Sequence, residues 1–256
     1  MTASWVQIHA EAAAVVASAA EDGMTVRIVG SAGIRMHCAE AQAAMDDVQR
    51  AAKDLDIVVR SGDRARLRSL LEARGYVVDR DLLVAMEGQR FAFHHPEHGL
   101  DVDVFVERLE FCHTIALDDR WERHATTIPI EDLLLQKLQV HQLTDADVID
   151  AAVVLATHEV GAAGDPERID RDYVAGVLAG DWGFHRDATA NLDRVRAAAG
   201  HEVPLSTARV SRVDAGAAAL SDAIAQAKKS MSWRMRARVG ERMQWWEDVN
   251  ERVDTY

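Results

Sequence analysis

The sequence predicts an α+β protein, in which a mixed sheet occupies the first part of the chain and helices occupy the rest. Short β-rich runs alternate with helical stretches up to about residue 120, and 100–106 (LDVDVFV) alternates residue by residue, as a half-buried strand does. Beyond residue 120 the apolar residues recur at helical spacing, without a convincing strand-like run. We therefore expect an α/β core over 1–120 and an all-helical region over 121–256.

Local signals place the elements of the core. An alanine-rich stretch with few helix breakers predicts a first helix, and β-rich runs between glycines and turn residues predict strands. The segment Ser61-Gly62-Asp63 predicts a turn and a helix N-cap, and Gly75 predicts the end of that helix. Four helices are expected, at 3–21, at 39–53, at 64–73 and in a segment that begins with 34–38. The expected extended segments are 25–29, 55–59, 82–86, 90–94 and 100–106, with a turn at 96–99.

The second part of the chain predicts a series of helices that begins after Ile128 and Pro129. The aromatic stretch Asp181-Trp182-Gly183-Phe184 predicts a compact turn between two of them. The expected helices are 132–142, 144–156, 170–179, 187–199, 214–230 and 232–252.

Composition narrows the class of protein. The 256 residues are 48% hydrophobic, enough for one large core or two modest ones, but no apolar run approaches the roughly 20 residues that a membrane span needs. The N-terminus lacks the features of a secretory signal peptide. We expect a cytoplasmic protein without a membrane partner. Cys38 and Cys112 each adjoin a histidine, so a metal site deserves testing, although buried thiols and packed histidines explain the pattern better.

The net charge of −13 argues against a general nucleic-acid-binding protein. The charge is uneven, because residues 226–242 (QAKKSMSWRMRARVGER) carry six Lys or Arg and one Glu. Basic residues interleaved with Trp and Met can bind RNA by charge and stacking. The same pattern also fits an amphipathic helix whose arginines pair with the acidic body of the protein, which we favour. Nucleic-acid binding is left open.

Two pairs of carboxylates stand out in the predicted sheet. Asp54 and Asp56 are two residues apart in a strand, so their side chains point to the same face, where like charges repel. A divalent cation would remove this conflict, and Mg²⁺ prefers oxygen ligands from carboxylates and phosphates. Asp101 and Asp103 repeat the spacing in 100–106. If this strand lies beside the first, carboxylates from both strands converge on a metal site.

A possible phosphate site precedes the acidic pair. The strand 25–29 leads through Gly30 and Ser31 into a helix. Glycine allows a close approach of the backbone, and the N-terminus of a helix offers N–H groups and a positive dipole to an anion. The order of phosphate cradle, paired Asp and a later acid on another strand is more specific than any of its parts.

These residues resemble the nucleotidyltransferase superfamily with the polymerase-β-like fold. Its pattern is a strand ending in Gly-Ser or Gly-Gly, a helix, Asp-x-Asp on the next strand, and a later acid in a hydrophobic strand. The matching segments here are IVGSAGIRMH, KDLDIVV and VDVFV, and the resemblance covers about residues 20–155. It is nearest to bacterial stand-alone nucleotidyltransferase-like proteins, and more distantly to nucleotidyltransferases of abortive-infection and toxin–antitoxin systems.

The resemblance implies a role for each matching residue. Asp54, Asp56 and Asp103 would hold Mg²⁺ or Mn²⁺, and Asp103 would help to deprotonate an acceptor hydroxyl. Asp101 is a rival for the role of Asp103 because it shares its face. Gly30 and Ser31 would hold the triphosphate of an NTP.

Two basic residues are further candidates for phosphate contacts. Lys137 edges an apolar helix face, so it either reaches out to water or points into a cleft that holds an anion; the resemblance favours the cleft. Arg35 lies four residues after Ser31 and is either a phosphate ligand or a solvated helix residue. Asp147 and Asp150 are expected to cap or pair within helices.

The implied activity is Mg²⁺-dependent transfer of an NMP from an NTP to a hydroxyl acceptor by two-metal, in-line attack. The acceptor is a protein, an RNA or a small molecule, and the sequence selects neither it nor the base. Two alternatives are a nucleotide-binding module without catalysis, and a toxin-like protein that binds a partner or RNA through its basic C-terminal helix.

Overall fold

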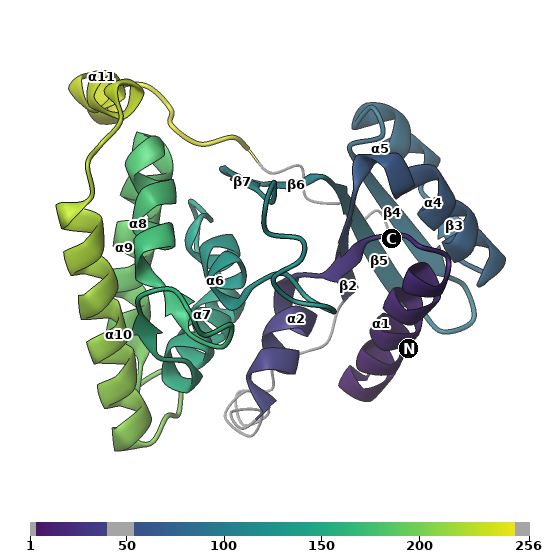
Figure 1. Cartoon of the computed structure of the whole chain (residues 1–256), viewed down its shortest axis with the longest axis horizontal. Helices are drawn as coiled ribbons and strands as arrows, with labels where there is room; N and C mark the ends of the chain where they lie inside the picture. The colour runs from purple at the N-terminus through teal and green to yellow at the C-terminus, as the bar shows by residue number, and fades with distance from the viewer. Residues whose placement is uncertain (1–3, 40–53, 249–256) are drawn as a thin grey trace.

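The computed structural model describes residues 4–39 and 54–248, and it has the α+β class that the sequence predicts (Figure 1). Its main sheet is mixed and has five strands in the order β1-β2-β5-β4-β3. The central pair, β2 and β5, is parallel, and the other neighbouring pairs are antiparallel. The strands are β1 (Val26–Ile28), β2 (Asp54–Val59), β3 (Val77–Val78), β4 (Arg90–His95) and β5 (Leu100–Val106).

One face of this sheet is covered by helices of the first part of the chain. Ile8 of α1 and Leu67 of α4 are fully buried in one hydrophobic cluster with Ile57 of β2 and Val104 of β5. Because side chains alternate along a strand, Asp56 and Asp103, the preceding residues, belong to the opposite face. The helices of this part are α1 (Trp5–Glu21), α2 (Gly30–His37), α4 (Arg64–Ala73) and α5 (Arg80–Ala85), with a 3₁₀ turn η2 (Ser61–Asp63).

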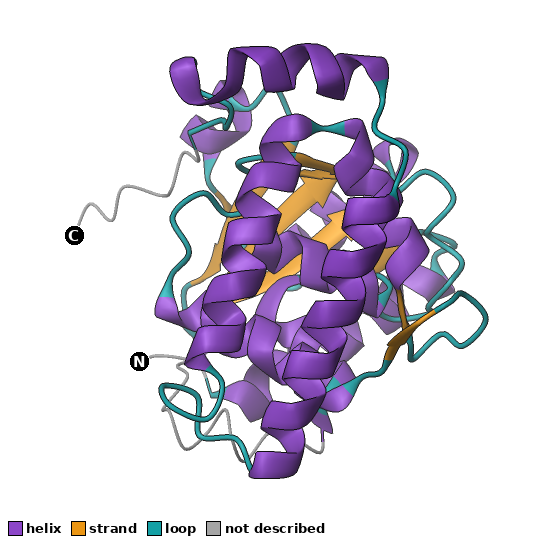
Figure 2. Ribbon diagram, turned by 90° about the vertical axis from the view of Figure 1, so that its left-hand side faces the viewer, coloured by secondary structure: helices purple, strands orange, loops and turns teal. Residues whose placement is uncertain are grey.

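The opposite face looks toward the helical part of the chain, which lies in front of the sheet in Figure 2. Val58 of β2 and Phe105 of β5 share a second hydrophobic cluster with Leu134 and Val154 of that part. The second cluster therefore crosses the predicted boundary near residue 120. The helices of the helical part are α6 (Ile130–Leu138), α7 (Asp145–Thr157), α8 (Arg171–Gly180), α9 (Trp182–Ala198), α10 (Thr207–Gln226) and α11 (Met231–Val239), with a 3₁₀ turn η3 (Gly240–Arg242).

Four short strands complete the described chain as two small sheets. β6 and β7 form an antiparallel pair that directly follows β5, and β8 and β9 form a parallel pair between α7 and α8. Neither sheet was predicted, because each strand has only two or three residues and no alternating pattern of its own. Their bounds are β6 (Arg108–Glu110), β7 (Thr114–Ala116), β8 (Val160–Gly161) and β9 (Ile169–Asp170).

In the core, most of the predicted elements are confirmed and one prediction is wrong. Gly75 closes α4 as predicted, with φ +92 and a hydrogen bond from Tyr76 N to Leu71 O. The segment 82–86 is mostly helical instead of extended, because the Asp79 carboxylate accepts hydrogen bonds from two N–H groups at the start of α5. Asp63 is the N-cap residue of α4, as predicted, but its side chain makes no capping hydrogen bond. Its Oδ2 instead accepts a hydrogen bond of 3.0 Å from Thr25 N.

In the helical part, capping residues explain the wrong predictions. Asp181 is the N-cap of α9, so the predicted aromatic turn is the first turn of that helix. Ser206 caps α10, which begins earlier than the predicted helix. The last helix ends at Val239 instead of continuing to 252, because Gly240 has φ +60 and turns the chain away.

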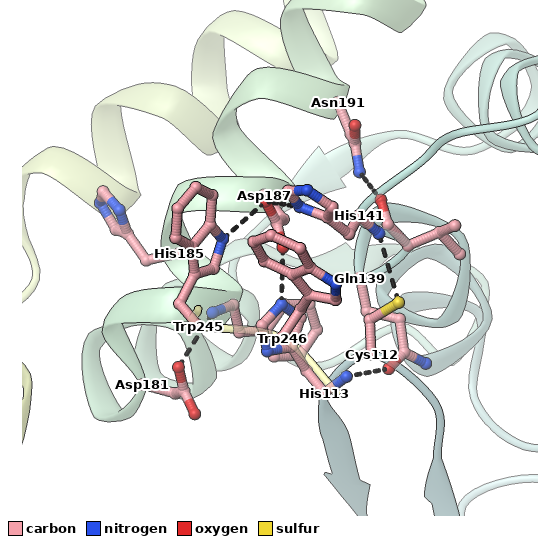
Figure 3. Close-up of polar contacts among 12 residues, drawn as sticks. Cys112, His113, Gln139, His141, Asp181, His185, Asp187, Asn191, Trp245 and Trp246 are labelled. Carbon is pink, nitrogen blue, oxygen red and sulfur yellow. Dashed lines mark hydrogen bonds and ion pairs between the residues drawn. The ribbon is translucent and has the colours of Figure 1, made fainter. Parts of the chain in front are cut away.

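After α11 the chain returns across the helical part and docks on a buried carboxylate (Figure 3). Asp187 accepts hydrogen bonds from His113 Nε2 at 2.9 Å, His141 Nδ1 at 3.0 Å and Trp245 Nε1 at 3.0 Å. Trp246 stacks on His141 with ring centroids 3.6 Å apart. Burial alone would raise the pKa of Asp187, but these hydrogen bonds outweigh it and lower the pKa.

Some predictions fall outside the described residues, namely those for 40–53 and for the end of the helix at 249–252. Among the helices of the described segments, none combines the length and the apolar character that crossing a lipid bilayer requires.

Candidate functional site

The three acids of the predicted metal site come together on the sheet face toward the helical part. The parallel pairing of β2 with β5 places Asp56 opposite Asp103, and Asp54 opposite Asp101. One carboxylate oxygen from each of Asp54, Asp56 and Asp103 lies within 4.8 Å of the others. The strand period of two therefore brings together, through β pairing, acids that are 47 residues apart.

This gathering of charge is electrostatically unfavourable in the absence of a cation. Burial raises the pKa of Asp56 well above its usual range, and the charges on Asp54 and Asp103 raise it further. Lys137 and Arg90 act in the opposite direction but do not reverse the shift. Asp56 therefore holds a proton more tightly than an ordinary carboxyl does, unless a ligand supplies positive charge.

The Gly30-Ser31 bend lies directly against this cluster. Val29 N donates a hydrogen bond of 3.0 Å to Asp56 O, which ties the bend to β2. Gly30 has φ +64, and a Cβ placed on it would lie 2.1 Å from Asp56 Oδ2. Only glycine permits both the left-handed conformation and this approach of backbone to carboxylate. The first turn of α2 therefore begins beside the acids.

Lys137 of α6 and Ser31 of the bend share a carboxylate partner in the helical part. Its side chain is buried, and Nζ lies 3.0 Å from Asp147 Oδ1 and 3.0 Å from Asp150 Oδ2. The Ser31 hydroxyl donates a hydrogen bond of 2.6 Å to the same Asp150 oxygen. Lys137 therefore points into the space between sheet and helices instead of reaching out to bulk water. Asp147 also caps α7 in a capping box with Thr144.

Two other sequence candidates lie apart from the three acids. Arg35 is buried and places its guanidinium over the Trp5 ring, 4.3 Å from the centroid, so it is not a solvated helix residue and is directed toward α1. Asp101 shares the face of Asp103, but its Oδ1 lies 2.8 Å from Nδ1 of His94 on the neighbouring strand, and it is not part of the three-acid group.

Two site residues were missed from the sequence. Arg90, at the start of β4, places Nη2 2.8 Å from Asp103 Oδ2, and Gln136 of α6 accepts a hydrogen bond of 2.8 Å from Gly30 N. The proximity of Gln136 to Lys137 in the sequence was the only available signal for it. No sequence signal pointed to Arg90, because its contact with Asp103 depends on the antiparallel pairing of β4 with β5.

Neither cysteine belongs to a metal-capable group among the described residues. Both are buried free thiols, and burial raises the pKa of Cys38 to about 12. His113 is bound to Asp187, as described above. The preferred interpretation of the cysteines as packed thiols is thus confirmed, whereas His37 belongs to a separate group of side chains described below.

The three-acid group fits a magnesium or manganese ion. Oxygens on opposite sides of an octahedral Mg²⁺ are about 4.2 Å apart, so a small side-chain adjustment from separations within 4.8 Å suffices. Asp103 Oδ1 is buried and has no hydrogen-bond partner among the described residues. Such an oxygen is costly to bury without a partner, and a cation would supply one.

No protein-family model, curated protein or solved structure matches this chain. The resemblance to nucleotidyltransferases therefore rests on the residues and motifs themselves, and function has to be argued from the site.

Proposed function

We propose that the protein is a Mg²⁺-dependent nucleotidyltransferase whose core has the polymerase-β-like arrangement. The proposal depends on one observation: three carboxylates from two parallel strands approach one another directly beside the Gly30-Ser31 bend. A carboxylate group that holds metal and a helix start that holds phosphate are the two components that a metal–triphosphate substrate requires.

Each residue has a role in this proposal. Asp54, Asp56 and Asp103 would hold Mg²⁺ or Mn²⁺, which would neutralise the charge of the triphosphate. The first turn of α2, with Gly30 and Ser31, faces the triphosphate. No phosphate contact is assigned to Arg35, since its guanidinium is stacked on Trp5.

Lys137 is the cation that would approach the phosphates from the helical part. It already lies near enough to lower the pKa of Asp56 by its charge. Its present partners, Asp147 and Asp150, keep a buried ammonium paired before substrate binds.

The proposed reaction is nucleotidyl transfer. The oxygen of an acceptor hydroxyl forms a bond to the α-phosphorus of the NTP, the bond from that phosphorus to the bridging oxygen of the β-phosphate breaks, and pyrophosphate leaves. Bound Mg²⁺ would neutralise the phosphate charge and align the attacking and leaving oxygens. Asp103 is the candidate acceptor for the hydroxyl proton, because it belongs to the three-acid group that would hold the metal. The chain's main contribution is positioning.

The test follows the label from α-³²P-NTPs, one base at a time, into a cell extract with Mg²⁺ or Mn²⁺. We expect transfer by the wild type and its loss in Asp56→Asn and Asp103→Asn. Asp101→Asn is the matched control, because Asp101 shares the strand face but belongs to a contact with His94. Equal transfer by the wild type and Asp56→Asn would refute the proposal.

Two further measurements, of NTP binding and of RNA or partner retention, separate the two alternatives. Saturable NTP binding without release of pyrophosphate would indicate a nucleotide-binding module. Retention of RNA or a protein partner would instead indicate a binding protein that acts through the basic segment 226–242. Its helix α11 has no buried residue and is therefore accessible to a partner. Charge reversal at the exposed Arg234 and Arg238 tests this more cleanly than deletion, which would also remove Trp245 from Asp187.

A further inference from the structure

A second group of metal-capable side chains lies at the other end of α2. His37 is the last residue of α2, His158 follows α7, and Glu167 lies in the loop between β8 and β9. One ligand atom from each lies within 4.8 Å of the others. The three side chains border a surface cavity of about 510 Å³. The His37 side chain is only 2% exposed, whereas that of Glu167 is 53% exposed, so a ligand could enter from the carboxylate side.

The hydrogen bonds around His37 define which of its nitrogens carries a proton. His124 Nδ1 accepts a hydrogen bond of 3.0 Å from Thr127 N, so it has no proton, and the Thr127 hydroxyl at 2.8 Å must donate to it. Thr127 Oγ1 can then only accept from His37, whose Nε2 lies 2.6 Å away. His37 Nε2 therefore carries the proton, and in the neutral ring Nδ1 has a lone pair.

This lone pair faces a carboxylate. His37 Nδ1 lies 3.3 Å from Glu167 Oε2, and in the neutral ring no proton lies between the two atoms. Either a second proton on His37 or a cation would resolve the conflict.

His158 also has one ring nitrogen that donates a hydrogen bond and one that is left with a lone pair. Its Nδ1 donates a hydrogen bond of 2.8 Å to the backbone carbonyl of Glu167 and lies 3.7 Å from Glu167 Oε2. The proton on Nδ1 leaves a lone pair on Nε2. His158 is 6% exposed, and Nε2 is buried without a hydrogen-bond partner among the described residues. Histidines that bind metal typically donate the other ring N–H to a carbonyl or similar acceptor, as both histidines do here.

We propose that His37, His158 and Glu167 form a binding site for a divalent transition metal, of which zinc is the representative. Two imidazoles and one carboxylate with an open side suit Zn²⁺, whereas Mg²⁺ prefers oxygen ligands only. The ion would join the end of α2 to the helical part. This site is separate from the three acids, and it does not depend on the proposed nucleotidyl transfer.

Cobalt(II) alone, in excess Mg²⁺, is the probe for the full chain after treatment with a chelator. We expect one Co²⁺ per chain with the strong visible absorption of a low-coordinate nitrogen and oxygen site, and displacement by Zn²⁺. Glu167→Gln should weaken binding at least tenfold. Glu159→Gln is the matched control, since Glu159 borders the same cavity outside the group, and it should bind as the wild type does. Thr127→Val, which removes the hydroxyl that orients His37, should weaken binding about 10–100-fold.

Because Glu167 is largely exposed, the metal-free Glu167→Gln variant should retain the melting temperature of the wild type, so a loss of Co²⁺ binding is not a loss of fold. The proposal is overturned if the wild type shows no Co²⁺ absorption, or if Glu167→Gln binds as tightly as the wild type. It is also overturned if Asp56→Asn abolishes the absorption, because the ion would then be held by the three acids.

Discussion

Replacing Asp56 by Asn should stabilise the metal-free protein, which is the opposite of what most substitutions at a partly buried site do. Two unit charges 4.8 Å apart repel by about 3.5 kcal/mol at an effective dielectric constant of about 20. Asp56 takes part in two such pairs, with Asp54 and Asp103. Arg90 and Lys137 offset part of this repulsion, and water screens the exposed Asp54. We therefore expect a net gain of about 1–2 kcal/mol in the free energy of unfolding.

The assay is thermal unfolding at pH 7 in the presence of a chelator, followed by addition of Mg²⁺. A gain of this size should raise Tm by about 2–8 °C in a chain of this length. Mg²⁺ should raise the Tm of the wild type and leave that of Asp56→Asn nearly unchanged, because the variant lacks a ligand. Asp101→Asn serves as the control, and it should have the wild-type Tm in chelator and keep the wild-type response to Mg²⁺.

The dependence on pH provides a second readout. The folded-state pKa of Asp56 is raised, so the folded protein binds the proton more tightly than the unfolded chain does. The destabilisation is therefore absent below the unfolded pKa of about 3.9 and grows as the pH rises through the folded pKa. The stability difference between Asp56→Asn and the wild type should disappear at low pH. A variant that is less stable than the wild type at pH 7 would show that the carboxylates do not repel as this reasoning requires.

Three further predictions concern the bend, a buried ion pair and the C-terminal segment. Gly30→Ala should abolish Mg²⁺-dependent NTP binding in calorimetry, and unchanged binding would contradict the role of the bend. The left-handed backbone alone should lower the free energy of unfolding of this variant by about 1–2 kcal/mol, and the clash with Asp56 adds to this. Arg120→Met should lower the free energy of unfolding in urea by about 3–5 kcal/mol, because Asp132, 2.8 Å from Arg120 Nε, would be left buried without its ion partner; a change below 1 kcal/mol would contradict it. The lowered pKa of Asp187 contributes stability that is present above its ordinary pKa of about 3.9 and lost as the pH falls through the folded pKa. Asp187→Asn should remove this dependence and change the tryptophan fluorescence of the folded protein, and retention of the wild-type pH profile would contradict the role of its hydrogen bonds.

The sequence was sufficient to predict which side chains share a face, but not which strands are neighbours. The period of two placed Asp54 with Asp56, and Asp101 with Asp103. Convergence of the two pairs was conditional on pairing between two strands that are not adjacent in the sequence, and the structure supplies that pairing. Local periodicity contains no information about such a long-range contact.

The choice between Asp101 and Asp103 required tertiary contacts. Both acids point the same way from β5, and the neighbouring strand β4 provides their different partners, His94 for Asp101 and Arg90 for Asp103. Likewise, the orientation of Lys137 depends on Asp150, which a different helix contributes. Helix ends were wrong for a related reason, since one side chain such as Asp181 decides where a helix begins and its role depends on the fold around it.

The position of the three acids is itself an argument that they bind a ligand. One face of β2 and β5 continues from Asp56 and Asp103 to Val58 and Phe105, and this apolar end packs into the core shared with the helical part. Apolar residues at the acidic end would extend that core and avoid the repulsion that raises the pKa of Asp56. Instead the face changes from apolar to acidic at the point where Gly30 brings the backbone against Asp56. A face that forgoes stability at this point is consistent with the proposal that a cation binds here.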